Sequence, residues 1–355
     1  EPCFLGPDDT LDTAQASLRL RVGIPARELA RRVPVCLVPI GYIESDPTLA
    51  GLGVVRAIAV GKLPVRLLIH EPAVGFALVK WIEVMARKHR VIADFCDDLA
   101  AAAVIYSRPA LAEFQRQLLL ACPATVPSSA LRERLAIDSR YDISVIEDPY
   151  ESALAREPRF MPDSVLRFAW FGVFGPPLRA FIQRQFTEIA LRISERTAEL
   201  AFVTHAGAET LVREMAAALH EDHPNFSIRF VEWSLEATAQ ELERADLVVL
   251  PQDAATDWGR VKSHNRLVEA IRAGRFAVVS PIPSYLELKD YAWVGANLTD
   301  GVEWALENPD QARKRIVAGQ TYIAERFAPA RIGAQWARVL GISEAEPDEN
   351  YAHPL

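Results

Sequence analysis

Basic and polar side chains gather between two short apolar runs in the second half of the chain. Lys262, Asn265 and Arg266 lie close together in this stretch. Residues 265–273 carry apolar side chains at positions 267, 268 and 271, a spacing that predicts a helix laid on a sheet. The amino end of a helix carries a partial positive charge, which adds to the charges of these cations. The stretch therefore predicts a site for an anionic group such as a phosphate.

The apolar runs on both sides of this stretch predict where the site lies. Residues 245–250 and 276–279 have the length and composition of strands, and a helix between two parallel strands makes a βαβ unit. Gly274 fits the left-handed position that ends such a helix. Because ligands of parallel sheets lie beyond the carboxyl ends of the strands, we expect residues 252–266 to form a loop over the site.

Other candidate ligand contacts follow predicted strands in the same half of the chain. Gly172 and Gly175 come directly after a strong strand pattern, where glycine lets backbone amides approach a phosphate; an ordinary tight turn is the alternative. His205 follows the next predicted strand and is a candidate contact for a phosphate or a base, with a turn histidine as the alternative. Trp233 is a candidate for stacking on a base, although core packing is the more common role of tryptophan.

The first half of the chain carries candidates for acid–base chemistry. His70 and Glu71 follow one predicted strand, and Asp94 and Asp98 follow the next. A histidine or carboxylate at the end of a strand can act as a general base or bind a substrate hydroxyl. The alternatives are a histidine that caps the next helix, and aspartates that bind a metal or cap a helix.

Two arginines near the start of the chain are a further candidate contact for an anion. Arg19 and Arg21 fall in a predicted helix, and either could meet an anionic ligand. A solvated helix face is the preferred interpretation of these two residues.

Length, charge and cysteine spacing restrict the class of protein. At 355 residues the chain is long enough for two domains, and half of it is hydrophobic. A net charge of −8 argues against nucleic acid as a partner. The four cysteines are far apart and form no C-x-x-C pair, which predicts a reduced, cytoplasmic protein without a zinc site. No apolar run approaches the roughly 20 residues of a membrane span, although peripheral membrane contact stays open.

The stretch from Lys262 to Ser280, K-S-H-N-R-L-V-E-A-I-R-A-G-R-F-A-V-V-S, resembles the donor-nucleotide segment of GT-B glycosyltransferases. The resemblance implies an α/β fold with two Rossmann-like domains and an interdomain cleft. It also implies that Lys262 contacts the donor phosphate and that Glu269 binds the ribose. Many retaining members carry a second glutamate eight residues earlier, where this chain has Val261, so neither the stereochemical outcome nor the donor is predicted.

The resemblance implies a division of the chain into parts with different roles. We expect an acceptor domain at 1–150, a linker at 151–164 and a donor domain at 165–327. We expect a helix that crosses back to the first domain at 328–343 and a loose tail at 344–355. The catalytic candidates belong to the first domain. The donor-binding candidates belong to the second; they are Gly172, Gly175, His205, Trp233, Lys262, Asn265, Arg266 and Glu269.

The predicted activity is transfer of a sugar from a nucleotide-activated donor to a glycan, lipid or small-molecule acceptor. The partners are then the nucleotide sugar and the acceptor, with no cofactor and no metal, because basic side chains take the place of the metal. A nucleotide-sugar epimerase and a non-catalytic binding module of the same fold are the alternatives. A dehydrogenase is disfavoured because no G-x-G-x-x-G follows a strand. The oligomeric state is not predicted.

Overall fold

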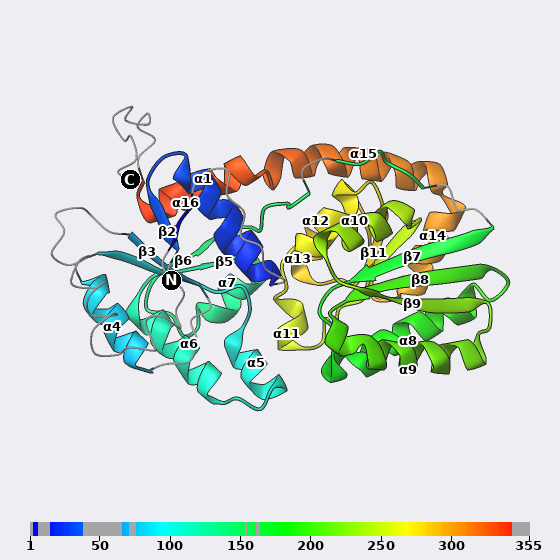
Figure 1. Ribbon diagram of the computed structural model, residues 1–355, viewed down its shortest axis with the longest axis horizontal. Helices are drawn as coiled ribbons and strands as arrows, with labels where there is room; N and C mark the ends of the chain where they lie inside the picture. The colour runs from blue at the N-terminus through cyan, green and yellow to red at the C-terminus, as the bar shows by residue number, and fades with distance from the viewer. Residues whose placement is uncertain are drawn as a thin grey trace. The chain divides into compact units, whose positions relative to one another are not determined.

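The computed structural model describes residues 3–5, 15–37, 66–70, 76–87, 89–152, 155–160 and 164–342 (Figure 1). The chain divides into two compact units. The first unit comprises Glu1–Pro149 and Phe327–Leu355, and the second comprises Tyr150–Arg326. Each unit has its own parallel sheet.

The first unit is built on a sheet of four parallel strands in the order β3-β4-β5-β6. These strands are β3 (Arg66–His70), β4 (Arg90–Asp94), β5 (Ala124–Val126) and β6 (Ile143–Val145). A separate antiparallel pair joins β1 (Cys3–Leu5) to β2 (Val35–Leu37). The helices are η1 (Leu18–Gly23), α1 (Ile24–Ala30), α4 (Phe76–Ala86), α5 (Leu99–Ile105), α6 (Ala110–Ala121), α7 (Ser129–Leu135) and α16 (Pro329–Leu340).

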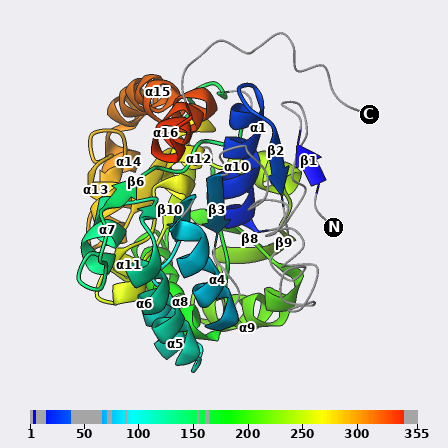
Figure 2. The same ribbon diagram turned by 90° about the vertical axis from the view of Figure 1, so that its left-hand side faces the viewer.

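The last helix of the chain completes the first unit. Helix α16 lies beside α1, as Figures 1 and 2 both show. Gly333 of α16 allows this approach, because a Cβ atom there would collide with Glu28 of α1. Trp336 and Ile332 are fully buried and pack with Ile92 of the sheet. Residues from the two ends of the chain therefore share one core.

The second unit is built on a sheet of six parallel strands in the order β12-β11-β10-β7-β8-β9. These strands are β7 (Val165–Phe171), β8 (Thr197–Thr204), β9 (Phe226–Glu232), β10 (Leu247–Leu250), β11 (Phe276–Val279) and β12 (Trp293–Val294). The helices are α8 (Pro176–Arg192), η2 (Ala206–Ala208), α9 (Glu209–Asp222), α10 (Leu235–Arg244), α11 (Asp257–Arg260), α12 (Asn265–Arg272), α13 (Pro283–Leu286), α14 (Leu298–Glu307) and α15 (Pro309–Arg326). Helices α8 and α9 cover one face of the sheet, and α10 and α12 cover the other (Figure 1).

The βαβ unit predicted around residue 265 is confirmed. Strands β10 and β11 pair in parallel and lie on either side of α12 in sequence. Gly274 has a φ of 74°, the left-handed conformation expected at the end of this helix. The preceding loop differs from the prediction because it contains the short helix α11, which Thr256 caps by accepting a hydrogen bond from the N–H of Gly259 at 3.1 Å.

The segment between the two sheets is bound to the second unit. The N–H of Arg156 donates to the carbonyl of Arg272 at 3.0 Å, and the N–H of Arg159 donates to that of Gly274 at 2.9 Å. Gly274 is required here for a second reason, because a Cβ atom would run into the carbonyl of Glu157. The described part of the predicted linker, residues 151–152, 155–160 and 164, thus lies within the second unit.

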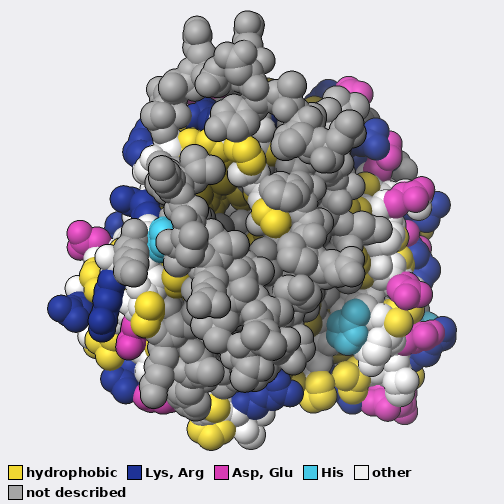
Figure 3. Space-filling view, turned by 60° about the vertical axis from the view of Figure 1, so that its left-hand side comes forward, with side chains coloured by type: hydrophobic (Ala, Val, Ile, Leu, Met, Phe, Trp, Pro, Cys, Tyr) yellow, Lys and Arg dark blue, Asp and Glu magenta, His cyan; other side chains and the backbone are white. Residues whose placement is uncertain are grey.

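None of the described helices combines the length and the apolar character that crossing a membrane requires. On the face drawn in Figure 3, the described Lys and Arg side chains are interspersed with Asp and Glu side chains.

Candidate functional site

The second unit contains a topological switch point between β7 and β10. These strands are neighbours in the sheet, but β7 leads to β8 on one side and β10 leads to β11 on the other. The loops that follow the two strands therefore diverge at the carboxyl edge, the edge at which α/β sheets bind ligands. Residues 172–175 follow β7 and residues 251–264 follow β10.

Arg266, in the first turn of α12, joins the ends of these strands. Its Nη1 donates to the carbonyl oxygen of Phe171 at 3.3 Å, and its Nη2 donates to Oε1 of Gln252 at 2.7 Å. The N–H of Gln252 in turn donates to Oγ of Ser280, at the end of β11, at 2.9 Å. One guanidinium group thus links the ends of β7 and β10, Gln252 extends the link to β11, and a positive charge lies at the switch point.

Gly172 and Gly175 have different structural roles. Gly172 has a φ of 149°, and a Cβ atom on it would lie 3.1 Å from Nη1 of Arg266. Both the backbone conformation and the overlying arginine therefore call for glycine. Gly175 is the N-cap of α8 with a φ of −165°, which any residue can adopt. Their predicted role as donor contacts stays a prediction.

His205 and Trp233 follow β8 and β9. Nε2 of His205 lies 2.9 Å from the carbonyl oxygen of Phe174, so this exposed histidine links its turn to the loop after β7. The N–H of Trp233 donates to the carbonyl of Thr204 at 2.8 Å, and its side chain is half-buried. The two residues lie at the carboxyl edge, as predicted from the strand pattern; ligand contact by either one stays a prediction.

The loop before α12 is held by its own contacts. The carbonyl of Lys262 accepts a hydrogen bond from Oγ of Ser284 at 2.7 Å, and its Nζ lies 3.4 Å from the centre of the Trp258 ring. A cation over an aromatic face is stabilised by the ring quadrupole. Gly259 packs so closely under Asp253 that no side chain fits there. These contacts therefore fix the position of the loop and of the Lys262 ammonium group.

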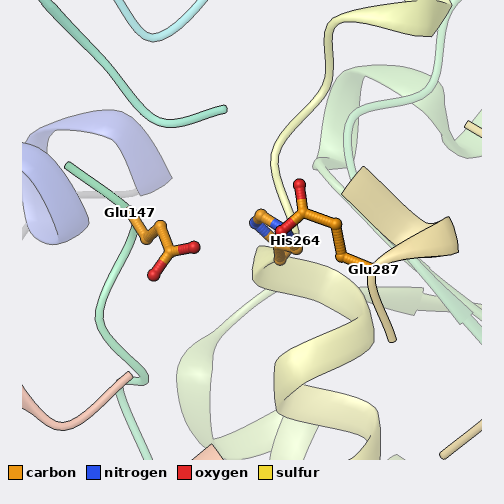
Figure 4. Close-up of side chains that lie close together, drawn as sticks. All are labelled: Glu147, His264 and Glu287. Carbon is orange, nitrogen blue, oxygen red and sulfur yellow. The ribbon is translucent and has the colours of Figure 1, made fainter. Parts of the chain in front are cut away.

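The amino end of α12 carries a histidine that the sequence interpretation did not select. Asn265 is the first helical residue, and its Oδ1 accepts from the N–H of Arg266 at 2.7 Å. His264, immediately before it, is 2% exposed, and its Nε2 lies 3.3 Å from Oε2 of Glu287 (Figure 4). Arg326 binds the same carboxylate at 2.6 Å.

The hydrogen bond from His264, followed by that from Arg326, lowers the pKa of Glu287 to about 2. This carboxylate is therefore ionised at neutral pH. The spacing of His264 and Glu287 in the sequence gives no sign of this pair, because their contact depends on the packing of α13 against the loop before α12.

Glu269 contacts the segment that enters the second unit. Its Oε1 accepts from the N–H of Glu151 at 2.6 Å, and its Oε2 accepts from Oγ of Ser152 at 2.8 Å. Burial raises the pKa of this carboxyl above its usual value, and the two hydrogen bonds work in the opposite direction. Arg272, one turn later, donates to the carbonyl of Ser152 at 2.8 Å. The ribose contact implied by the resemblance stays a prediction for Glu269.

In the first unit Asp94 is part of a buried ion-pair network. Asp94 ends β4 and is fully buried; Nε and Nη2 of Arg21 donate to its two oxygens at 3.1 and 2.6 Å. Oγ1 of Thr125 donates to the same carboxylate at 2.7 Å. Arg21 also binds Asp148 at 3.2 Å. Burial works to lower the pKa of Arg21, but the charges of Asp94 and Asp148 outweigh it and raise the pKa.

The predicted solvated helix face at Arg19 and Arg21 is therefore wrong. Arg19 is 7% exposed and Arg21 is 1% exposed. The physical reason is that carboxylates from β4 and from residue 148 compensate the buried guanidinium, which a helix pattern alone does not reveal.

Asp98 has the capping role that was the alternative to catalysis. Its Oδ1 accepts from the N–H groups of Ala100 and Ala101 at 2.9 and 3.2 Å, at the start of α5. Its Oδ2 lies 3.1 Å from Nε of Arg134. The capping interpretation is confirmed, and a catalytic role for Asp94 or Asp98 stays a prediction.

The other two catalytic candidates precede α4. His70 is the last residue of β3, and its backbone is in register with Asp94 on the neighbouring strand. Glu71 lies outside the described residues. His70 and Asp94 therefore share the carboxyl edge of the first sheet, as the strand pattern predicted.

Known sequences and known structures give different answers about relatives. No protein-family model matches the chain, and no curated protein sequence matches it significantly. Solved structures do match. OtsA superposes with a TM-score of 0.61 at 10% identity over 84% of this chain and 77% of its own. Anabaena HepE in complex with UDP gives 0.57 at 15% identity over 82% and 81%. TarM gives 0.56 at 11% identity over 77% and 54%. These neighbours are GT-B glycosyltransferases, and the chain has the α/β GT-B fold.

Proposed function

We propose that this protein is a glycosyltransferase that moves a sugar from a nucleotide-activated donor to a hydroxyl group of an acceptor. The observation that carries the proposal is the switch point of the second unit, where Arg266 and the amino end of α12 lie beside the Gly172 loop. Lys262 precedes the same helix. The guanidinium of Arg266, the ammonium of Lys262 and the partial positive charge of the helix end can together bind a diphosphate. HepE, which has the same fold, has been solved with UDP and with UDP-glucose.

At the anomeric carbon of the donor sugar the reaction forms one bond and breaks one, and one proton is transferred. An acceptor oxygen bonds to the anomeric carbon of the donor sugar while the bond from that carbon to the phosphate oxygen breaks, and the electron pair leaves with the nucleotide. The proton of the acceptor hydroxyl passes to a base or to the departing phosphate. Positive groups fixed before the reaction stabilise the negative charge that develops on that phosphate. In this proposal Lys262 and Arg266 supply that stabilisation.

The base would come from the first unit. Asp94 and Asp98 already accept hydrogen bonds or ion pairs on both carboxylate oxygens. These oxygens are therefore already engaged by groups of the protein, which disfavours either carboxylate as the group that takes the proton of the acceptor. We therefore assign the base to His70 or Glu71, and we assign Asp94 and Asp98 to the support of that edge.

A transfer assay tests the proposal. Purified protein is incubated with uridine, guanosine, adenosine and cytidine nucleotide sugars and a mixture of sugar acceptors, and release of nucleotide is measured. We expect release with one donor class, and a loss of at least a hundredfold in rate for Lys262→Ala. Lys289→Ala, an exposed lysine of the same unit, is the matched control. Nucleotide binding without turnover in every mixture would point to a non-catalytic module, and a new nucleotide sugar formed without acceptor would point to an epimerase.

The proposal includes catalysis without a metal ion, because the cations at the switch point can neutralise the diphosphate. Addition of EDTA should leave the rate unchanged. Loss of activity in EDTA and its recovery with manganese would remove this part of the proposal and leave the transferase assignment intact.

A further inference from the structure

A charged cavity of about 280 Å³ lies in the second unit, between the sheet and α10. Its charged lining consists of Arg167, Glu199, Arg229, Glu241 and Arg244. Arg167 and Glu199 are the third residues of β7 and β8. The cavity is therefore displaced toward the amino ends of the strands, whereas the switch-point loops lie beyond the carboxyl ends.

Charged residues interrupt the apolar runs of β7 and β8, and a third charged residue lies on the edge strand β9. Strands buried on both faces of a parallel sheet normally read as continuous hydrophobic runs. Here β7, β8 and β9 each carry one charged residue in their interior. Arg167 is in register with Glu199, and Ala201, two residues later on the same face, is in register with Arg229. The three charged side chains thus meet on one face of the sheet, under a short polar helix.

Most of these charges compensate one another. Glu241 is 6% exposed and accepts from Nη2 of Arg229 at 2.7 Å; Nη1 of Arg244 lies 3.4 Å away from the same carboxylate. Nε of Arg229 donates to Glu199 at 3.1 Å. The hydrogen bond that Arg229 donates to Glu241 is the largest cause of the raised pKa of Arg229. Both glutamates of the lining are thereby engaged by two of its three arginines.

The guanidinium of Arg167 is the charged group of the lining that these ion pairs do not include. Among the residues that the structure describes, it forms no hydrogen bond and no ion pair. The carboxylate of Asp246, the residue immediately before β10, accepts from the backbone N–H of Arg167 at 2.9 Å. With three arginines against two glutamates the lining has one excess positive charge. A half-buried charge without a partner is unfavourable unless a ligand or water compensates it.

We propose that this cavity binds a small oxyanion, with its carboxylate or phosphate group on Arg167. A planar guanidinium can donate two parallel hydrogen bonds to such a group. Ala201 and Ala245 leave room beside it, because longer side chains at these lining positions would fill the space. Glu199, another lining residue, can accept from hydroxyl groups of the same molecule. The volume suits a ligand smaller than a nucleotide sugar, so this site is separate from the proposed donor site.

Calorimetric titration with inorganic phosphate, and separately with succinate, tests the site at an ionic strength held constant with potassium chloride. We expect one saturable site per chain for at least one of the two anions. The anion that binds more tightly shows whether the site prefers a phosphate or a carboxylate group. Arg167→Gln should weaken this binding at least tenfold. Arg213→Gln, which removes an exposed arginine of α9 paired with Glu209, should leave it unchanged.

Two further variants keep the test decisive. Ala201→Val retains every charge but fills the cavity, and it should also weaken binding at least tenfold even if Arg167→Gln proves unstable. Lys262→Ala should retain the binding, which separates this site from phosphate bound at the switch point. Absence of saturable binding would overturn the proposal. The proposal would also be overturned if Arg167→Gln bound the anion as tightly as the unchanged protein does. It would equally be overturned if only Lys262→Ala lost the binding, a result that would leave the proposed donor site intact.

Discussion

A single arginine in the second unit combines a structural task with a chemical one. Arg266 holds the ends of β7 and β10 together through Phe171 and Gln252, and its positive charge stays at the switch point. Its position next to Lys262 was visible in the sequence because both precede an amphipathic helix between two strands. Its contact with the loop after β7 was not visible, because Phe171 lies 95 residues earlier in the chain.

The same contact predicts that Gly172 tolerates no side chain. Gly172→Ala must adopt a φ near 149° and approach Arg266 at 3.1 Å, which we expect to lower the free energy of unfolding by about 1–3 kcal/mol. Gly175→Ala is the matched control. Its backbone is extended, and the nearest atom to an added Cβ lies at 3.9 Å. Urea denaturation of both variants measures the difference; equal stability would show that the loop can rearrange.

Contacts between residues that are far apart in the chain could not be predicted from the sequence. Asp94 was selected because it follows a strand, which is a local pattern. Its partner Arg21 lies 73 residues away, and no spacing rule connects the two. The His264–Glu287 pair was missed for the same reason. Residue type and strand position predicted which groups gather at each edge, while the pairing itself depends on tertiary packing.

At the scale of elements, α12 has two functions along its length. Its amino end faces the switch point, and its later turns hold the segment 150–160 through Glu269 and Arg272. The apolar spacing and Gly274 were sufficient to predict this helix and its flanking strands. Helix α11 was not predicted, because it spans only four residues and depends on the Thr256 cap and the close contact at Gly259.

Glu269→Gln separates the two roles of this helix. Burial raises the pKa of Glu269, so the neutral carboxyl favours the folded state over the unfolded state. This stabilisation is fully present below the unfolded pKa of the carboxyl and is lost as pH rises through its folded pKa. We therefore expect the variant to be as stable as the unchanged protein or more stable at pH 8, with the gain shrinking toward pH 4. Denaturation midpoints at the two pH values measure this.

Nucleotide affinity gives the second readout of the same variant. If Glu269 binds ribose, the affinity for nucleotides should fall at least tenfold while stability is retained, because the charged hydrogen bond is lost. Glu214→Gln, at an exposed glutamate of α9, is the control and should change neither quantity. Unchanged affinity would restrict Glu269 to the anchoring of residues 151 and 152.

At the scale of the whole molecule, the chain consists of two units that each have a parallel sheet with candidate residues at its carboxyl edge. The fold class was predictable because strand and helix patterns alternate along the entire chain. Which charged residues the units bury was not predictable. Arg21 in the first unit and the row of charges under α10 in the second both lie in segments whose local pattern gives no sign of their partners.

Acid stability of the molecule should depend on Glu287. Its pKa is lowered to about 2 by His264 and then by Arg326, so its contribution is present above the unfolded value near 4.5 and is lost as pH falls through about 2. Glu287→Gln should therefore be less stable than the unchanged protein at pH 7, with the difference closing toward pH 2. Glu325→Gln, exposed on the same helix as Arg326, should show no such trend. A difference that is independent of pH would exclude the ion pair as its cause.

Nucleotide binding should protect one unit more than the other. The proposed donor contacts all belong to the second unit, and a ligand present at 100 times its dissociation constant stabilises its binding partner by about 2.7 kcal/mol. Hydrogen exchange with saturating nucleoside diphosphate should slow in peptides that cover residues 170–175 and 252–266. Peptides from β4 and β5 serve as the internal control and should change less, because the diphosphate contacts lie on α12 and the β7 loop. The Lys262→Ala variant should lose the protection in both peptides. Protection confined to the first unit would place the nucleotide there, and the assignment of the switch point as the donor site would then fail even if the protein transfers sugars.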